Sequence, residues 1–231
     1  MNCYGCPLAT VSCPIGTLQH FVIIKAVPFM LIGFLVVIGT TVGRMACGWV
    51  CPFGFFQEWL YKIKTKKFHP KKFWSYSKYF ILVILTLVIA YFLAEPWFCK
   101  LCPVGTLEAG IPLIIWNPSS DVFSPENSIA ARVGTLFYLK VLILVGIVGL
   151  AVIIKRAFCR FICPLGAIFS LFNRFSFFKL KVEKDGCLAC KECEEKCPMD
   201  LNVYANTNDP DCIRCLKCTE CQGVSWEFKW K

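Results

Sequence analysis

The sequence predicts a mostly helical membrane protein. We expect a tandem-duplicated helical membrane domain, with about three spanning helices plus short half-helices, followed by a small α+β module. Three observations predict this architecture. The chain of 231 residues is 57% hydrophobic and only 17% charged, whereas soluble domains are about a quarter charged. It contains 17 cysteines. Its cysteine motifs also recur in the same order in two halves of the chain.

The charge distribution predicts two domains. Residues 1–178 carry 16 Lys and Arg against 5 Asp and Glu, whereas residues 179–231 carry 9 against 10. We expect a membrane domain over residues 1–176 and a second domain over residues 177–231. The membrane domain consists of two repeats, residues 1–75 and 95–176, joined by a returning helix over residues 79–94. Its basic residues flank apolar runs, as is usual beside membrane spans, so they do not predict a nucleic-acid partner.

Three apolar runs are the predicted spans: Ala26–Val42, Tyr79–Ala94 and Val141–Ile154. None contains a charged residue. Each is shorter than the roughly 20 residues that cross a bilayer squarely, but apolar flanks lengthen the first and third. The alternative is that they are core helices of a soluble protein, and the chain has too little polar surface to cover them. We therefore expect a multi-pass protein of the cell membrane, in contact with lipid.

The positions of lysine and arginine predict the orientation. These residues gather in segments 44–78 and 155–181, whereas segment 95–135 contains only Lys100 and Arg132. The positive-inside rule places the two basic segments in the cytoplasm. The N-terminus is then outside or at the outer interface, and the C-terminal domain is cytoplasmic. Residues 1–19 have neither a basic start nor an apolar core, so we expect no cleavable signal peptide.

Each repeat contains a Cys-Pro-x-Gly motif, an apolar span and a second cysteine motif. CPIGTLQ at 13–19 recurs as CPVGTLE at 102–108, and GRMACGWVCPFG at 43–54 recurs as KRAFCRFICPLG at 155–166. Proline suits the first position of a helix, which places the preceding cysteine at the N-cap. There the helix dipole and free N–H groups favour a thiolate and a bound anion. An iron–sulfur cluster held by four thiolates is such an anion.

The distance between motifs decides which cysteines can meet. A continuous span of about 25 residues is about 37 Å long, so Cys13 and Cys47 cannot share a cluster. Each site must therefore combine cysteines of both repeats. Disulfides and structural zinc are the alternatives, but the ligand type and the matched motifs favour [4Fe–4S] clusters. The inner set is Cys47, Cys51, Cys159 and Cys163. The outer set is Cys6, Cys13, Cys99 and Cys102, with Cys3 as an alternative to Cys6.

Two cysteine runs near the C-terminus predict a bacterial-type 2[4Fe–4S] ferredoxin module. In such modules the fourth cysteine of each run binds the other cluster. The second run has only two residues before its last cysteine and no proline after it, so a [3Fe–4S] or strained cluster stays open. Segments 177–183 and 224–230 alternate enough to pair as antiparallel strands. Cluster one is predicted on Cys187, Cys190, Cys193 and Cys221, and cluster two on Cys212, Cys215, Cys218 and Cys197.

These motifs carry a family resemblance that covers nearly the whole chain. The chain resembles the polytopic ferredoxin-type membrane proteins of the NapH/MauN kind. The resemblance implies a membrane electron-transfer protein with [4Fe–4S] clusters, and its best-known member type resembles a quinol dehydrogenase that feeds a partner oxidoreductase. The residues that carry it are CYGCP at 3–7, SCPIGTLQHF at 12–21, CGWVCPFG at 47–54, CPVGTLEAGIP at 102–112, CRFICPLGAI at 159–168 and the two C-terminal runs.

We therefore expect a subunit that carries single electrons between a cytoplasmic ferredoxin-like iron–sulfur partner and an acceptor in or across the membrane. It would work with other subunits of a redox complex. The sequence contains no recognisable haem, flavin or nicotinamide site. One alternative is a quinol or quinone oxidoreductase, for which Glu58 is the main candidate proton-handling residue, with Gln57, His20 and Glu108 as others. A redox sensor or assembly factor is the third hypothesis.

Overall fold

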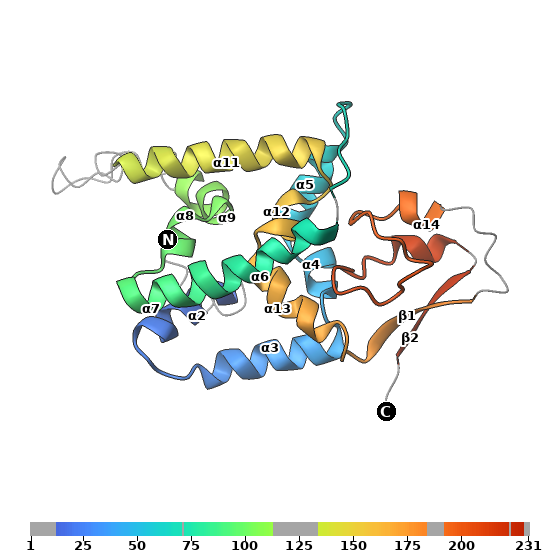
Figure 1. Ribbon diagram of the computed structural model, residues 1–231, viewed down its shortest axis with the longest axis horizontal. Coiled ribbons are helices and arrows are strands. Elements are labelled where there is room, and N and C mark those ends of the chain that lie inside the picture. Colours follow the sequence, from blue (N-terminus) through green and yellow to red (C-terminus); the bar gives the residue numbers. More distant parts are fainter. Residues whose placement is uncertain (1–12, 71, 113–133, 184–191, 222, 229–231) are drawn as a thin grey trace. The chain divides into compact units, whose positions relative to one another are not determined.

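The computed structural model describes residues 13–70, 72–112, 134–183, 192–221 and 223–228 (Figure 1). Most of these residues are helical, which confirms the predicted helical class. The chain divides into two compact units. The first consists of Met1–Val27 and Ile84–Leu150, and the second of Pro28–Val83 and Ala151–Lys231. The domain boundary near residue 176 stays a prediction.

Helices are the regular elements of the first unit in its described part. Helix α2 packs against α7. The elements of this unit are α2 (Pro14–Ile23), α7 (Ile89–Leu93), α8 (Trp97–Leu101), α9 (Pro103–Gly105), the π-helical turn η3 (Thr106–Gly110) and most of α11 (Thr135–Ile153).

The second unit contains the remaining helices and both strands. Helix α13 packs against α3 and α6, and α12 packs against η1. The π-helical segment η2 (Leu82–Val88) spans the division between the units. The helices of the second unit are α3 (Phe29–Thr41), α4 (Met45–Trp49), α5 (Pro52–Tyr61), η1 (Lys72–Tyr76), α6 (Ser77–Ile81), α12 (Ala157–Phe161), α13 (Pro164–Phe172), α14 (Glu192–Glu195) and η7 (Lys217–Glu220).

The sequence repeat is also a structural repeat. In each half, an apolar helix is followed by a helix of five residues and then by a helix that begins after a cysteine. The order is α3, α4 and α5 in the first half and α11, α12 and α13 in the second. The two halves therefore present equivalent pairs of cysteines on equivalent elements.

Two of the described helices are long and apolar enough to cross a membrane by length and composition. They are the continuous helix Lys72–Leu93, with 22 residues, and α11, with 19 residues; α3 is shorter, with 13. Helix α11 begins six residues before the predicted run and therefore includes Lys140. A membrane helix can contain one lysine near its end, because the long side chain can extend to the interface. The arrangement with three spans stays a prediction.

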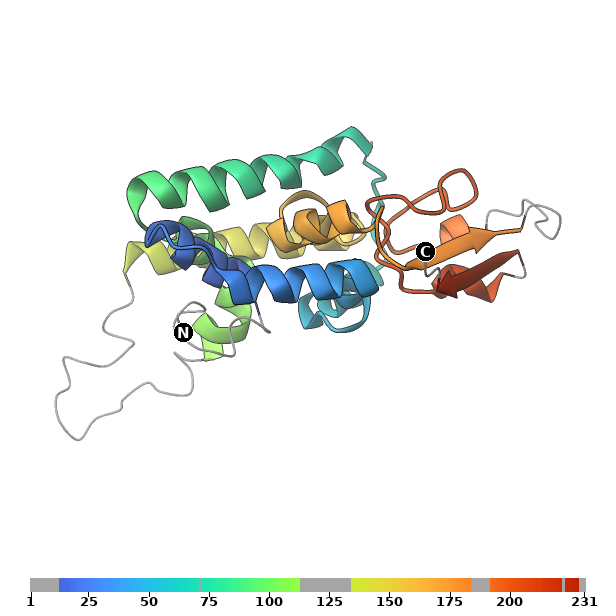
Figure 2. The ribbon, with the colours of Figure 1, turned by 90° about the horizontal axis from the view of Figure 1, so that it is seen from below.

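Two short strands form an antiparallel sheet in the C-terminal region. Strand β1 (Phe178–Val182) pairs with β2 (Val224–Phe228), and Figure 2 shows the two arrows running in opposite directions. Leu180 lies opposite Trp226, and the Trp226 ring stacks on Phe178 with centroids 5.5 Å apart. Leu180 and Val224 are buried in one apolar cluster. The predicted pairing of the two strands is confirmed.

Candidate iron–sulfur sites

All four cysteines of the Cys-Pro-x-Gly motifs lie at helix N-caps. Cys13, Cys51, Cys102 and Cys163 have extended backbones, and the proline after each is at the start of α2, α5, α9 or α13. The Cys163 Sγ accepts a hydrogen bond from the Gly166 N–H at 3.4 Å. The predicted caps are therefore confirmed, and each sulfur lies where a helix terminus favours negative charge.

The inner set comes together within the second unit. Cys47 lies on α4 and Cys159 on α12, and Cys51 and Cys163 cap the two helices that follow. Burial raises the pKa of the Cys47 thiol to about 11, against the opposing charge of Arg44, and Cys159 and Cys51 raise it further. The pKa of Cys163 is raised well above its usual value by burial and then by the other three cysteines. Four cysteines of both repeats thus share one buried site.

This inner set fits an iron–sulfur cluster. Buried thiols with raised pKa values ionise readily only next to a strong positive centre, and a cubane core is one. No three His, Cys, Asp or Glu side chains in the described ranges are close enough together to hold one metal ion. A bound cluster would supply a one-electron carrier, and the four cysteines would be its ligands.

Three polar side chains surround the inner cysteines. Gln57 donates its amide N–H to the Cys159 Sγ at 3.3 Å. Arg44 donates from Nη2 to the Cys159 carbonyl at 3.2 Å, and Arg156 donates from Nη1 to the Cys47 carbonyl at 3.0 Å. The two arginines therefore reach across to the opposite repeat in the same way. Gly54 and Gly166 leave room for them, because a Cβ there would lie 3.1 and 3.0 Å from a guanidinium nitrogen.

The second predicted cluster site of the C-terminal module is also assembled. A single cavity is lined by Cys197, Cys212, Cys215 and Cys218. Burial raises the pKa of Cys218 to about 12, with further contributions from the other three thiols. The Arg214 N–H donates to the Cys212 Sγ at 3.4 Å. A cavity lined by four cysteines, with a backbone N–H on sulfur, fits the predicted cluster two.

The first predicted cluster site is described only in part. Cys193 and Cys221 pack against the same apolar cluster, which contains Leu180 and Val224. Cys187 and Cys190 lie outside the described residues. The assignment of Cys221 to cluster one, and the choice between a [4Fe–4S] and a [3Fe–4S] cluster, stay predictions.

The outer set lies in the first unit as far as it is described. Cys13 caps α2, Cys99 lies on α8 and Cys102 caps α9. The Gln19 Oε1 accepts a hydrogen bond from the Cys99 N–H at 3.3 Å, which joins the outer motifs of the two repeats. Cys3 and Cys6 lie outside the described residues, so the fourth outer ligand stays a prediction.

The candidate residue Glu58 lies in an ion-pair network. Its carboxylate contacts Arg156 at 2.7 Å and Lys217 at 2.8 Å. Burial raises the pKa of Glu58, but the Lys217 hydrogen bond and the Arg156 charge outweigh burial and bring it below the usual value. Glu58 is therefore held ionised, which suits a structural ion pair better than proton exchange with a quinone.

Comparison with known proteins identifies the family. A family described as a 4Fe–4S binding domain matches residues 26–72, 79–111 and 136–184. The chain belongs to this 4Fe–4S binding domain family. The family resemblance to NapH/MauN-type proteins is thereby confirmed, and with it membership of a family of iron–sulfur electron-transfer proteins.

Several relatives of this 4Fe–4S binding domain protein are similar over most of its length. Two uncharacterised proteins of Methanocaldococcus jannaschii are 32% and 30% identical to it. The first match covers 94% of this chain and 86% of the relative, and the second 88% and 72%. The methylamine utilization ferredoxin-type protein MauN of Methylobacillus flagellatus is 23% identical over 68% of this chain and 48% of its own. No solved structure shows a significant match.

Two arginines beside the inner cysteines are not among the residues that the sequence motifs predict for this site. Arg44 and Arg156 each precede the first inner cysteine of their repeat by three residues. That equivalence is visible in the aligned motifs and could have marked both residues. The sequence makes Gln57 a candidate for the quinone and proton-handling site, whereas in the structure its amide donates to the Cys159 sulfur.

Proposed function

We propose that the protein is a membrane-bound electron-transfer subunit that carries single electrons between a cytoplasmic ferredoxin-like partner and an acceptor in or across the membrane. One observation carries the proposal. The cysteines of the predicted cluster two lie directly against the helix that bears the inner cysteine Cys47. Close approach of redox sites within one chain is the arrangement that electron transfer requires, and the protein supplies it by packing.

The contact is made by α4 and by segment 213–215. Cys47 packs against the apolar cluster that contains Cys197, Met199 and Ile213. A Cβ on Gly48 would lie only 2.7 Å from the Ile213 carbonyl oxygen, so only glycine allows this approach. Trp49 donates its indole N–H to the carbonyl of the residue after Ile213, at 3.3 Å.

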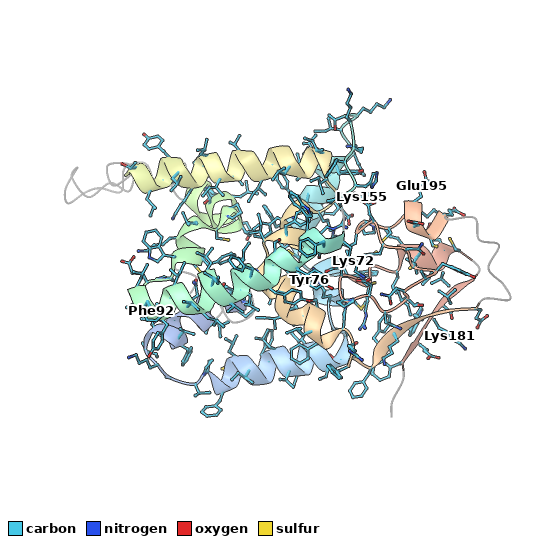
Figure 3. All side chains as sticks on the ribbon, in the orientation of Figure 1. Lys72, Tyr76, Phe92, Lys155, Lys181 and Glu195 are labelled. Carbon is cyan, nitrogen blue, oxygen red and sulfur yellow. The ribbon has the colours of Figure 1, made fainter. Side chains whose placement is uncertain are left out.

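Ion pairs hold the C-terminal region in this position. Lys155, which begins the second inner motif, pairs with Asp200 at 2.8 Å and donates to the Glu195 carbonyl at 3.3 Å (Figure 3). Lys72, also labelled in Figure 3, pairs with Asp209. Basic residues of the helical part thus meet acidic residues of the C-terminal module, which favours one fixed docked position.

The division into units supports the proposed topology. The basic segments 44–78 and 155–181, the inner cysteines and the C-terminal module all belong to the second unit. The outer cysteines belong to the first unit. The positive-inside rule would place the basic segments of the second unit in the cytoplasm.

The proposal is tested by Gly48→Ala in the anaerobically purified full chain. The added Cβ must push segment 213–215 away from Cys47, so we expect slower reduction of the membrane clusters by a reduced soluble ferredoxin. Freeze-quench electron paramagnetic resonance measures this rate. Gly33→Ala is the matched control, because a Cβ there meets nothing within 4 Å. Equal rates in both variants, or clusters confined to the C-terminal module, would contradict the proposed function.

A quinol or quinone oxidoreductase is the second candidate function, and one observation favours it. Partial desolvation raises the pKa of Glu108, which makes this carboxyl a better proton-handling group than Glu58. If quinone binds, we expect Glu108→Gln to lower quinone-dependent turnover and Glu58→Gln to leave it nearly unchanged. Turnover that is lost in Glu58→Gln alone would reverse the assignment, and absence of any quinone-dependent turnover would remove this function.

A further inference from the structure

The first repeat contains the same glutamine twice. Gln19 lies six residues after the capping cysteine Cys13, and Gln57 lies six residues after the capping cysteine Cys51. Both side chains are almost fully buried, with 0% and 1% of the residue exposed. A buried amide needs partners for both its oxygen and its nitrogen. An identical position on two cysteine-capped helices indicates a shared role.

At the inner site the role of Gln57 is visible. Its Oε1 accepts a hydrogen bond from the Phe158 N–H at 3.0 Å. Its Nε2 donates to the Cys159 Sγ at 3.3 Å and to the Phe53 carbonyl at 3.3 Å. One side of the amide thus holds the backbone just before the first inner cysteine of the second repeat, and the other side donates to the sulfur of that cysteine.

At the outer site Gln19 makes the first half of this arrangement. Its Oε1 accepts a hydrogen bond from the Cys99 N–H at 3.3 Å. Cys99 is the first cysteine of the outer Cys-x-x-Cys-Pro pair of the second repeat. A backbone N–H can form a hydrogen bond only with an acceptor, so the amide atom that faces the Cys99 N–H is the oxygen. The amide nitrogen, Nε2, therefore points away from the Cys99 backbone.

The Gln19 amide nitrogen has no acceptor among the described residues that would correspond to the sulfur at the inner site. The Gln19 Nε2 is buried and has no hydrogen-bond partner in the part of the chain that the structure describes. Burying an amide donor without a hydrogen-bond partner costs about 1–3 kcal/mol. At the inner site the equivalent nitrogen meets sulfur, so the expected acceptor at the outer site is also sulfur.

We propose that Gln19 and Gln57 are equivalent positioning residues, each of which directs an amide N–H at the sulfur of one membrane iron–sulfur cluster. Gln57 serves the inner cluster and Gln19 the outer one. This inference rests on the proposed function and extends it. Hydrogen bonds to sulfur stabilise the more negative, reduced state and so raise the reduction potential. The equivalent positions of the second repeat carry Glu108 and Phe169, whose side chains have no amide N–H.

The test is an anaerobic redox titration of Gln19→Leu and Gln57→Leu in the full chain, followed by electron paramagnetic resonance. We expect each variant to lower the midpoint potential of a different cluster signal, while iron and sulfide per chain stay at the wild-type value. Unchanged potentials in both variants, or a shift of the same signal in both, would overturn the proposal. Phe169→Leu is the control at the equivalent position of the second repeat, and we expect it to shift neither signal.

A second measurement uses the unmutated protein and does not depend on how the variants fold. Chains labelled with 15N in the glutamine side chain are reduced, and pulsed electron paramagnetic resonance detects nitrogen coupled to each cluster. We expect a 15N coupling on each of the two membrane clusters. If membrane clusters are present without either coupling, the glutamine inference is wrong and the proposed function stands. If no membrane cluster is found, the proposed function itself fails.

Discussion

Two buried arginines give the inner site its electrostatic character. Each arginine donates a hydrogen bond to the carbonyl of the first inner cysteine of the other repeat. Each also forms an ion pair with a carboxylate, and a lysine contacts that same carboxylate. Each group of three therefore keeps one net positive charge. A cluster bound by four thiolates is negative and becomes more negative on reduction, so two positive groups favour the reduced state. The groups are Arg44, Asp211 and Lys78, and Arg156, Glu58 and Lys217.

The first prediction concerns this charge. Replacing Arg156 by glutamine removes a buried positive charge next to Cys47 while keeping a hydrogen-bond donor. We expect the midpoint potential of the inner cluster to fall, as measured by redox titration with electron paramagnetic resonance. Lys62→Gln is the control, because it removes the same charge from an exposed side chain. A fall of the same size in both variants would show that overall charge, and not the position of Arg156, sets the potential.

The second prediction concerns Glu58 as a structural residue. Glu58→Gln keeps the shape of the side chain but leaves Arg156 without its carboxylate partner. For a partly buried pair we expect a loss of about 1–3 kcal/mol in the free energy of unfolding. Denaturant unfolding of the detergent-solubilised protein measures this loss. Glu227→Gln on the exposed face of β2 is the control, and an equal effect in the two variants would argue against the ion pair.

At the scale of elements, the end of α13 joins the helical part to the C-terminal module. Asn173 follows α13 and is fully buried. Its Oδ1 accepts from the Arg44 N–H at 3.0 Å, and its Nδ2 donates to the Cys212 carbonyl at 2.6 Å. Its own carbonyl accepts from Arg214 at 2.8 Å. One residue thus connects the first inner motif, the turn into β1 and the loop of cluster two.

The third prediction follows from this junction. Asn173→Ala leaves the Arg44 N–H and the Cys212 carbonyl without partners, so we expect a loss of about 2–4 kcal/mol in stability. The C-terminal module should also become easier to cleave in limited proteolysis. Asn202→Ala is the matched control, because its side chain is exposed and accepts a local hydrogen bond from the Ala205 N–H. Equal proteolysis rates for both variants would contradict the proposed junction.

Local signals account for what the sequence predicted at this scale. The cysteine caps and the β1–β2 pair follow from proline position and from residue alternation, which act over a few residues. The sequence repeat predicted that the four inner cysteines lie close together. The docking of segment 213–215 on Gly48 and the reach of Arg44 to Asp211 join residues more than 160 positions apart. No local pattern encodes such contacts, since they depend on the packing of the complete second unit.

For the whole molecule, the division into two units separates the predicted cysteine sets. The inner set and both C-terminal runs belong to the second unit, and the outer set belongs to the first. The four inner cysteines and the four cysteines of the predicted cluster two form no disulfide in the described part of the chain. Cluster binding requires reduced thiols in sets of four. The number of such sets gives an expected iron content for the complete chain.

The fourth prediction is therefore an iron and acid-labile sulfide content of about 16 each per chain for four cubanes, in anaerobically purified protein. The C-terminal module alone would give about 8. Cys159→Ser should remove about 4 of each from the wild-type value, because the inner site loses one ligand. Full content in that variant would show that the inner cysteines hold no cluster.

The difference between Gly48 and its repeat counterpart Arg160 also bears on how copies of the chain meet one another. Two equal halves would offer two docking faces, and a C-terminal module from a neighbouring molecule could occupy the second one and link molecules into open chains. Arg160 is buried instead, donating to the Pro70 carbonyl while its own carbonyl accepts from Ser75. The second face is thus covered by the segment that precedes α6. We expect this difference at one position to disfavour exchange of the C-terminal module between neighbouring molecules.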